Sequence, residues 1–164
     1  MRSLVIGRFQ PLHCGHLKMI EYVAEMSNFI TIGVGSCNSR NSVDNPFTAE
    51  EREEMLKESL RIKPPYEIRR IPDFGDNRLW ISWVRENIRF DTFYTNSPIE
   101  RKIFQDAGLA VEVAPFFDRD KYSATEVRRR ILEDEDWMSL LPEGTIAVLS
   151  TIDGIFRIKK LSIK

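Results

Sequence analysis

The amino-acid sequence predicts an α/β fold: a Rossmann-like, doubly wound parallel sheet with helices on both faces and a short helical C-terminal segment. Short runs rich in apolar and β-branched residues alternate with longer amphipathic stretches, and short loops join them. The first run, residues 3–7 (SLVIG), is apolar almost throughout, as in strands that are buried on both faces of a parallel sheet. Repeated strand–helix units of this kind imply right-handed crossovers.

The predicted elements follow from periodicity, in chain order. After the strand at residues 3–7, Leu17, Ile20 and Ala24 lie at helical spacing and predict a helix. The elements that follow the first strand are expected to be a helix over 17–26, a strand over 29–35, a helix over 48–60, a strand over 66–71, a helix over 77–88, a strand over 91–96, a helix over 97–108, a strand over 110–114 and a helix over 123–135.

Three of these helices begin with a capping-box pattern, in which a Ser or Thr is followed three residues later by Glu. The pairs are Thr48 with Glu51, Ser97 with Glu100, and Ser123 with Glu126. In such a box each side chain accepts a hydrogen bond from the backbone of the other residue. The pattern therefore predicts where each helix begins.

The segment after Pro142 has two interpretations. Residues 145–153 (TIAVLSTID) are β-branched enough for a strand, whereas Pro142 before them and Gly154 after them are typical of helix ends. We favour helices, with a second short one over 155–163. The chain is then a single domain over 1–164, in which about 142–164 is a C-terminal helical appendage.

Composition excludes several classes of protein. The formal net charge is -1, which argues against a general nucleic-acid partner. No apolar run reaches 18 residues, so we expect no membrane partner. Cys14 and Cys37 have no metal-ligand spacing and are expected to be free thiols. We therefore expect a cytoplasmic protein.

The loop after the first strand, residues 7–16 (GRFQPLHCGH), contains both histidines of the chain. In doubly wound sheets ligands bind at the carboxyl ends of the strands, and the start of the next helix favours phosphate. His13 and His16 are expected to share a helix face, and Arg8 adds a forked donor. Two histidines without a third ligand make a poor metal site. The loop therefore predicts a phosphate site.

The two glycines of this loop have an expected purpose as well. Gly7 ends the strand where a Cβ atom would crowd a ligand, and Gly15 lets the backbone approach one closely.

Four stretches resemble one known family. HCGH at 13–16 resembles the HxGH motif of the nucleotidyltransferase superfamily, and YSATEVRRR at 122–130 resembles its second motif, [IY]S[GSA]TxxR. With NPFTAEER at 45–52 and DNRLWISW at 76–83, the chain is similar over nearly its full length to the archaeal nicotinamide-nucleotide adenylyltransferases. It departs from that family's pattern at Leu12, where phenylalanine is usual, at Cys14, where a cation is common, and at Ala124, where glycine is frequent.

The resemblance implies an activity in NAD biosynthesis. The phosphate of nicotinamide mononucleotide would attack the α-phosphate of ATP directly and in line, giving NAD and pyrophosphate. This nucleophile is ionised near neutral pH, so the protein has only to position two phosphates and offset their charge. Nicotinic acid mononucleotide is an alternative substrate. Mg²⁺ is expected to bind mainly through the ATP phosphates, with no metal-ligating residues in the protein, and the family suggests a homo-oligomer such as a hexamer.

The resemblance also implies roles for individual residues. His16 would contact the α-phosphate, while His13 and Arg128 complete the catalytic set. Arg8 would help to hold the triphosphate. The expected ATP-binding residues are Gly7, Arg8, Phe9, His13, His16, Asn96, Tyr122, Ser123, Thr125 and Arg128.

The second substrate is expected in the region around DNRLWISW. Asp73 and Asn77 offer hydrogen bonds to an amide or a ribose, and Trp80 offers a flat ring for stacking on a pyridinium. The structural alternative is that Trp80 and Trp83 are core residues of an amphipathic helix. Two functional alternatives also stay open: an adenylyltransferase for phosphopantetheine or a flavin mononucleotide, and a nucleotide-binding regulator without turnover.

Overall fold

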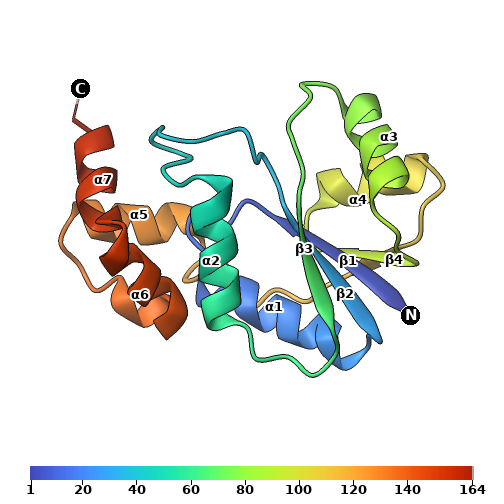
Figure 1. Cartoon of the computed structure of the whole chain (residues 1–164), viewed down its shortest axis with the longest axis horizontal. Helices are drawn as coiled ribbons and strands as arrows, with labels where there is room; N and C mark the ends of the chain where they lie inside the picture. Colours follow the sequence, from blue (N-terminus) through green and yellow to red (C-terminus); the bar gives the residue numbers. More distant parts are fainter. Residues whose placement is uncertain (164) are drawn as a thin grey trace.

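The computed structural model describes residues 1–163, and its centre is a five-stranded, wholly parallel sheet (Figure 1). The strand order is β3-β2-β1-β4-β5. The strands after β1 are therefore added first on one side of β1 and then, from β4 on, on its other side, so the switch point lies between β1 and β4. Ligands of such sheets bind at this switch point. The strands are β1 (Arg2–Gly7), β2 (Phe29–Val34), β3 (Tyr66–Arg70), β4 (Thr92–Thr95) and β5 (Val111–Val113).

Helices cover both faces of the sheet, as the sequence predicts. Leu4 of β1 packs with Phe93 and Phe104 in one buried cluster, whereas its neighbour Val5 packs with Ile20 and Leu56 in another. Figure 1 shows α3 and α4 together on one side, and α2 beside α5, α6 and α7 on the other. The helices are α1 (Cys14–Glu25), α2 (Ala49–Ser59), α3 (Asn77–Asn87), α4 (Pro98–Asp106), α5 (Ala124–Leu132), α6 (Glu143–Thr151) and α7 (Gly154–Leu161).

The C-terminal segment is helical, which confirms the favoured interpretation over the strand. Val148 and Leu149 of α6 and Ile158 of α7 are buried in the same cluster as Val5. Arg157 of α7 makes two hydrogen bonds to the carboxylate of Glu51 in α2, at 2.6 and 2.8 Å. The segment is therefore tied to the sheet through α2. Within residues 1–163, no helix combines the length and the hydropathy needed to cross a membrane.

The structure departs from the predicted boundaries at several places; for example, α5 ends at Leu132 rather than at residue 135. Helix α1 begins at Cys14 rather than Leu17, because the side chain of His13 caps it. A short 3₁₀ helix, η1 (Met138–Leu140), follows α5 where the sequence predicts no element.

The capping-box pattern predicts the start of all three helices correctly, because Thr48, Ser97 and Ser123 are the N-caps of α2, α4 and α5. The full reciprocal box forms in only one of them. Thr48 and Glu51 form the full reciprocal box at the start of α2. Ser97 and Ser123 do accept the expected backbone hydrogen bonds, but the glutamates at Glu100 and Glu126 do not return them. Each of these two carboxylates binds another side chain, and for Glu100 that partner lies at the edge of a cavity.

Candidate active site

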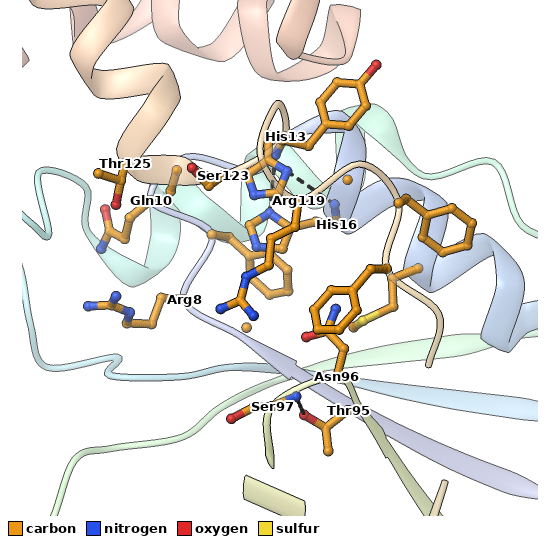
Figure 2. Close-up of a pocket in the computed structure, with 18 of the residues that line it drawn as sticks. Arg8, Gln10, His13, His16, Thr95, Asn96, Ser97, Arg119, Ser123 and Thr125 are labelled. Carbon is orange, nitrogen blue, oxygen red and sulfur yellow. Dashed lines mark hydrogen bonds between the residues drawn. The ribbon is translucent and has the colours of Figure 1, made fainter. Parts of the chain in front are cut away.

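Two adjoining cavities open at the carboxyl ends of the strands. The first, of about 370 Å³, lies between the loop after β1, the loop after β4 and the start of α5 (Figure 2). The second, of about 610 Å³, lies between the ends of β1 and β2 and the start of α3. Ile6, Gly7, Arg8 and Glu100 line both cavities. A ligand in one cavity would therefore lie against a ligand in the other.

The structure brings together every site residue that the sequence predicts. All three residues expected to bind the mononucleotide, Asp73, Asn77 and Trp80, line the second cavity. The first cavity contains the whole expected ATP-binding set, which is Gly7, Arg8, Phe9, His13, His16, Asn96, Tyr122, Ser123, Thr125 and Arg128. What each of them does for a nucleotide stays a prediction.

The two histidines form a capping box at the start of α1. Nδ1 of His13 accepts a hydrogen bond from the backbone N–H of His16, and Nδ1 of His16 accepts one from the backbone N–H of His13, each at 3.3 Å. The two rings stack with their centroids 3.6 Å apart. Since both Nδ1 atoms are acceptors, each neutral ring carries its proton on Nε2. The fold thus fixes one tautomer for both rings and leaves each Nε2–H as a donor.

Burial keeps both rings neutral. It lowers the pKa of His13 to about 4, and burial together with the charge of His13 lowers the pKa of His16 well below its ordinary value. At neutral pH the pair therefore acts as hydrogen-bond donors and not as cations.

The glycine between the histidines lines the first cavity and also makes room for neighbouring protein side chains. A Cβ atom on Gly15 would lie 2.7 Å from Cβ of Tyr122 and 3.0 Å from the ring of His13. Similarly, a Cβ atom on Gly7 would lie 2.7 Å from the ring of Phe9. Gly15 therefore lets the two sequence motifs, which are more than a hundred residues apart, touch.

Phe9, which contacts the ring of His16, has an unusual backbone conformation. Its φ is 53°, in the left-handed region that non-glycine residues rarely adopt, at a cost on the order of 1–3 kcal/mol. Its ring is only 2% exposed and meets the ring of His16 edge-on, with centroids 4.9 Å apart. The strained turn therefore places an aromatic side chain that limits the movement of His16.

Of the three consecutive arginines in α5, only Arg128 lines the first cavity. Its guanidinium donates to the backbone carbonyl of Gln10 at 2.9 Å and lies 3.5 Å from the carboxylate of Asp44. Arg129 and Arg130 instead pair with Glu126 on their own helix. Arg128 is therefore the candidate for binding phosphate, whereas Arg129 and Arg130 stabilise the helix.

Sequence reasoning missed several residues of the first cavity. Figure 2 shows the side chain of Arg119 extending toward the open space bounded by Arg8, His16 and Asn96. Its signal in the sequence is its position three residues before the second motif, in FFDRDKY. The other missed residues are Ile6, Gln10, Met19, Thr95, Ser97, Glu100, Phe116 and Phe117.

A buried arginine, Arg52, connects the two loops that follow β1 and β2. Arg52 is fully buried and donates to the backbone carbonyls of Arg8 at 2.9 Å, Gly35 at 2.8 Å and Ser36 at 3.1 Å. Burial lowers its pKa to about 10. It has no carboxylate partner within residues 1–163, so carbonyl groups alone compensate its charge. Arg52 therefore fixes the ends of β1 and β2 against each other.

Trp80 contacts both the hydrophobic core and the second cavity. It packs edge-on against Phe104 of the core, with ring centroids 5.5 Å apart, and it also lines the cavity. Trp83, by contrast, packs against the core cluster and does not line the cavity. Asp73 accepts from Ser39 at 3.5 Å, and Asp76 caps α3 through the backbone N–H groups of its first turn.

Comparisons with known proteins agree with this geometry. The model of the cytidylyltransferase-like family matches residues 4–130. Among curated proteins, the chain is 41% identical to a nicotinamide-nucleotide adenylyltransferase of Methanococcus aeolicus, with 100% of this chain and 96% of that protein covered. It is 40% identical to one of Thermococcus sibiricus, with 99% and 90% covered, and 36% identical to one of Archaeoglobus fulgidus, with 99% and 98% covered.

Solved structures show the same fold at lower identity. Two are of a bifunctional NMN adenylyltransferase/ADP ribose pyrophosphatase from Francisella tularensis, one of them in complex with AMP and a Mn ion. The TM-scores are 0.78 for the complex and 0.80 for the other, at 21% and 20% identity. The likeness covers 98% of this chain but only about half of those proteins, 51% and 52%.

Proposed function

The chain belongs to the cytidylyltransferase-like family and, within it, to the nicotinamide-nucleotide adenylyltransferases, and we propose from this that its two cavities hold ATP and nicotinamide mononucleotide side by side. The observation that carries the proposal is the wall that the cavities share at Gly7 and Arg8, in the segment that connects β1 to His16 in the first turn of α1. Two nucleotides bound there would meet at their phosphates. The products of their joining are NAD and pyrophosphate.

The residues of the first cavity suit this reaction. An oxygen of the mononucleotide phosphate bonds to the α-phosphorus of ATP, while the bond from that phosphorus to the bridging oxygen of the β-phosphate breaks and pyrophosphate leaves. His16 donates Nε2–H to the α-phosphate as negative charge develops, and a donor fixed in advance needs no reorganisation. Arg8, Arg128 and the start of α5 hold the β- and γ-phosphates. No proton has to be removed from the nucleophile, so the neutral histidines are not needed as bases.

The residues of the second cavity suit the mononucleotide. The free ring face of Trp80 stacks on the pyridinium, and Asp73 and Asn77 accept or donate hydrogen bonds at the ribose or the carboxamide. Nicotinic acid mononucleotide would fit the same space.

Mg²⁺ is part of the same proposal, and we place it on the triphosphate. Among residues 1–163, no group of three or more His, Cys, Asp or Glu side chains is arranged to hold an ion. The first cavity offers arginines and neutral N–H groups, and these donors suit phosphate oxygens and not a bare cation. When bound, the ion would neutralise charge on the triphosphate. Chelation with EDTA should therefore stop turnover, and calorimetric titration with Mg²⁺ alone should give no heat of specific binding.

An acceptor series tests the proposed substrates. ATP and Mg²⁺ are supplied with nicotinamide mononucleotide, its acid analogue, phosphopantetheine or flavin mononucleotide, and the product mass and pyrophosphate are measured. We expect NAD from the first acceptor. A product with phosphopantetheine or the flavin alone would contradict our assignment of the second cavity, and ATP binding without any product would favour a regulator.

Assembly and location complete the proposal. The family resemblance supports a homo-oligomer, such as a hexamer, in the cytoplasm. A particle of only monomer mass in light scattering would contradict the homo-oligomer. Recovery of the protein in the membrane fraction would contradict the cytoplasmic location.

A further inference from the structure

Glu100 occupies the boundary between the two cavities. It lies in the first turn of α4 and is one of four residues that line both spaces, together with Ile6, Gly7 and Arg8. Among these four it is the one with an acidic side chain. The proposed adenylyl transfer assigns it no task.

The side chain of Glu100 is turned away from its usual place in a capping box. Such a glutamate would accept from the backbone N–H of Ser97. Instead, that N–H donates to the hydroxyl oxygen of Thr95 at 3.0 Å, and the Thr95 hydroxyl donates to Oε2 of Glu100 at 2.6 Å. Oε1 has no hydrogen-bond partner among residues 1–163. Thr95 therefore holds the carboxyl by one oxygen and leaves the other for a ligand.

The charge of the lining changes sign across Glu100. In the first cavity, Arg8, Arg119 and Arg128 outnumber the single carboxyl, that of Glu100. In the second cavity, Asp73, Asp76 and Glu100 outnumber the single arginine, Arg8. A triphosphate is thus favoured in the first space, and additional negative charge is disfavoured in the second.

Of the three carboxyls in the second cavity, that of Glu100 is the least exposed to water. Asp73 and Asp76 are exposed, so water and salt screen them, whereas Glu100 is half-buried. Burial raises the pKa of the Glu100 carboxyl, and the hydrogen bond from Thr95 partly opposes that rise. When the Glu100 carboxyl is ionised, water therefore screens its charge less than it screens the charges of Asp73 and Asp76.

We propose that Glu100 is a specificity-determining residue, which selects nicotinamide mononucleotide over nicotinic acid mononucleotide. This inference rests on the proposed function. Both compounds have a cationic pyridinium ring, but the acid analogue carries one more carboxylate, and Glu100 repels it. A preference of about tenfold corresponds to only about 1.4 kcal/mol, which a like charge several ångströms away in a partly desolvated site readily supplies.

The test compares kcat/KM for the two mononucleotides at saturating ATP and Mg²⁺. We expect the unmodified protein to prefer nicotinamide mononucleotide by about tenfold or more. Glu100→Gln keeps an oxygen for the Thr95 hydroxyl but removes the charge. It should raise kcat/KM for the acid analogue about tenfold, mainly through KM, and change that for nicotinamide mononucleotide less than about threefold.

Glu86→Gln is the matched control. Glu86 is exposed on α3 and lines neither cavity, so this variant removes the same charge and should leave the preference unchanged. An equal shift in both variants would overturn the assignment to Glu100. So would an unchanged preference in Glu100→Gln, or equal use of both substrates by the unmodified protein; each of these leaves the proposed function standing. Failure to form either dinucleotide would instead overturn the proposed function itself.

Discussion

Replacing Gly15 with alanine tests the contact between the two sequence motifs. The new Cβ atom would lie 2.7 Å from Cβ of Tyr122, whereas carbon atoms in good contact are about 3.5–4.0 Å apart. The neighbours must therefore separate by roughly 1 Å. Because Cβ of Tyr122 is fixed to the backbone, a rotamer change cannot relieve the contact. Overpacking of this kind costs about 1–3 kcal/mol, and the better helix propensity of alanine offsets up to about 1 kcal/mol.

The effect on activity should exceed the effect on stability. With the full offset, the net destabilisation is at most about 2 kcal/mol, which would lower Tm by roughly 4–8 °C in a chain of this size. In contrast, a displacement of roughly 1 Å between the histidines and the start of α5 should lower kcat/KM for ATP about 100-fold. Steady-state kinetics and thermal unfolding measure the two effects on the same sample.

A double-mutant cycle isolates the cause. Tyr122→Ala keeps the Cβ atom that Gly15→Ala would meet, whereas Tyr122→Gly removes it. The cost of Gly15→Ala should therefore persist in the alanine background and shrink in the glycine background. Wild-type kinetics for Gly15→Ala, or equal costs in both backgrounds, would refute the reasoning.

Four further predictions follow from the same contacts. His16→Ala should fold and lose about 2.7–4 kcal/mol of transition-state stabilisation, measured as kcat; an unchanged kcat would contradict its role. Trp80→Ala should raise KM for the mononucleotide far more than KM for ATP, and equal effects would favour a purely structural Trp80. Arg52→Met leaves buried carbonyls unsatisfied and should lower the unfolding free energy by about 3 kcal/mol, measured in urea, whereas a change under about 1 kcal/mol would show that water replaces the guanidinium. Because the pKa of His13 is about 4 in the folded state and roughly 6.5 when unfolded, the unfolded chain binds more protons between these values. Stability should therefore fall by up to about 3 kcal/mol between pH 7 and pH 4 and fall less in His13→Gln; a flat profile would contradict the buried neutral ring.

The sequence predicted the parts of the site that depend on position along the chain. The histidine loop follows the first strand, and the second motif begins α5, the helix that contains Arg128, so the rules for parallel sheets bring them to one edge. The alternation of strands and helices likewise predicted the fold class. That 1–164 forms a single domain stays a prediction.

The parts that sequence reasoning missed depend on competition between partners. Thr48 and Ser97 open the same capping-box pattern, yet only the first box closes, because the hydroxyl of Thr95 binds Glu100. Arg52 is the last residue of the NPFTAEER stretch, but its burial against carbonyl groups follows only from the packing of two loops. No local signal marked the left-handed backbone of Phe9, since bulky residues there are rare. Both glycines line the first cavity, as expected, but no sequence signal identified their close protein neighbours, Tyr122 and Phe9.

The central claim is that the protein transfers the α-phosphate of ATP, with its adenosine, to a mononucleotide. The most direct measurement supplies nicotinamide mononucleotide with ATP labelled either at the α- or at the γ-phosphate and locates the label in the products. We expect all α-label in NAD and all γ-label in pyrophosphate. An α-label that leaves with pyrophosphate, or a γ-label transferred to the mononucleotide, would contradict it.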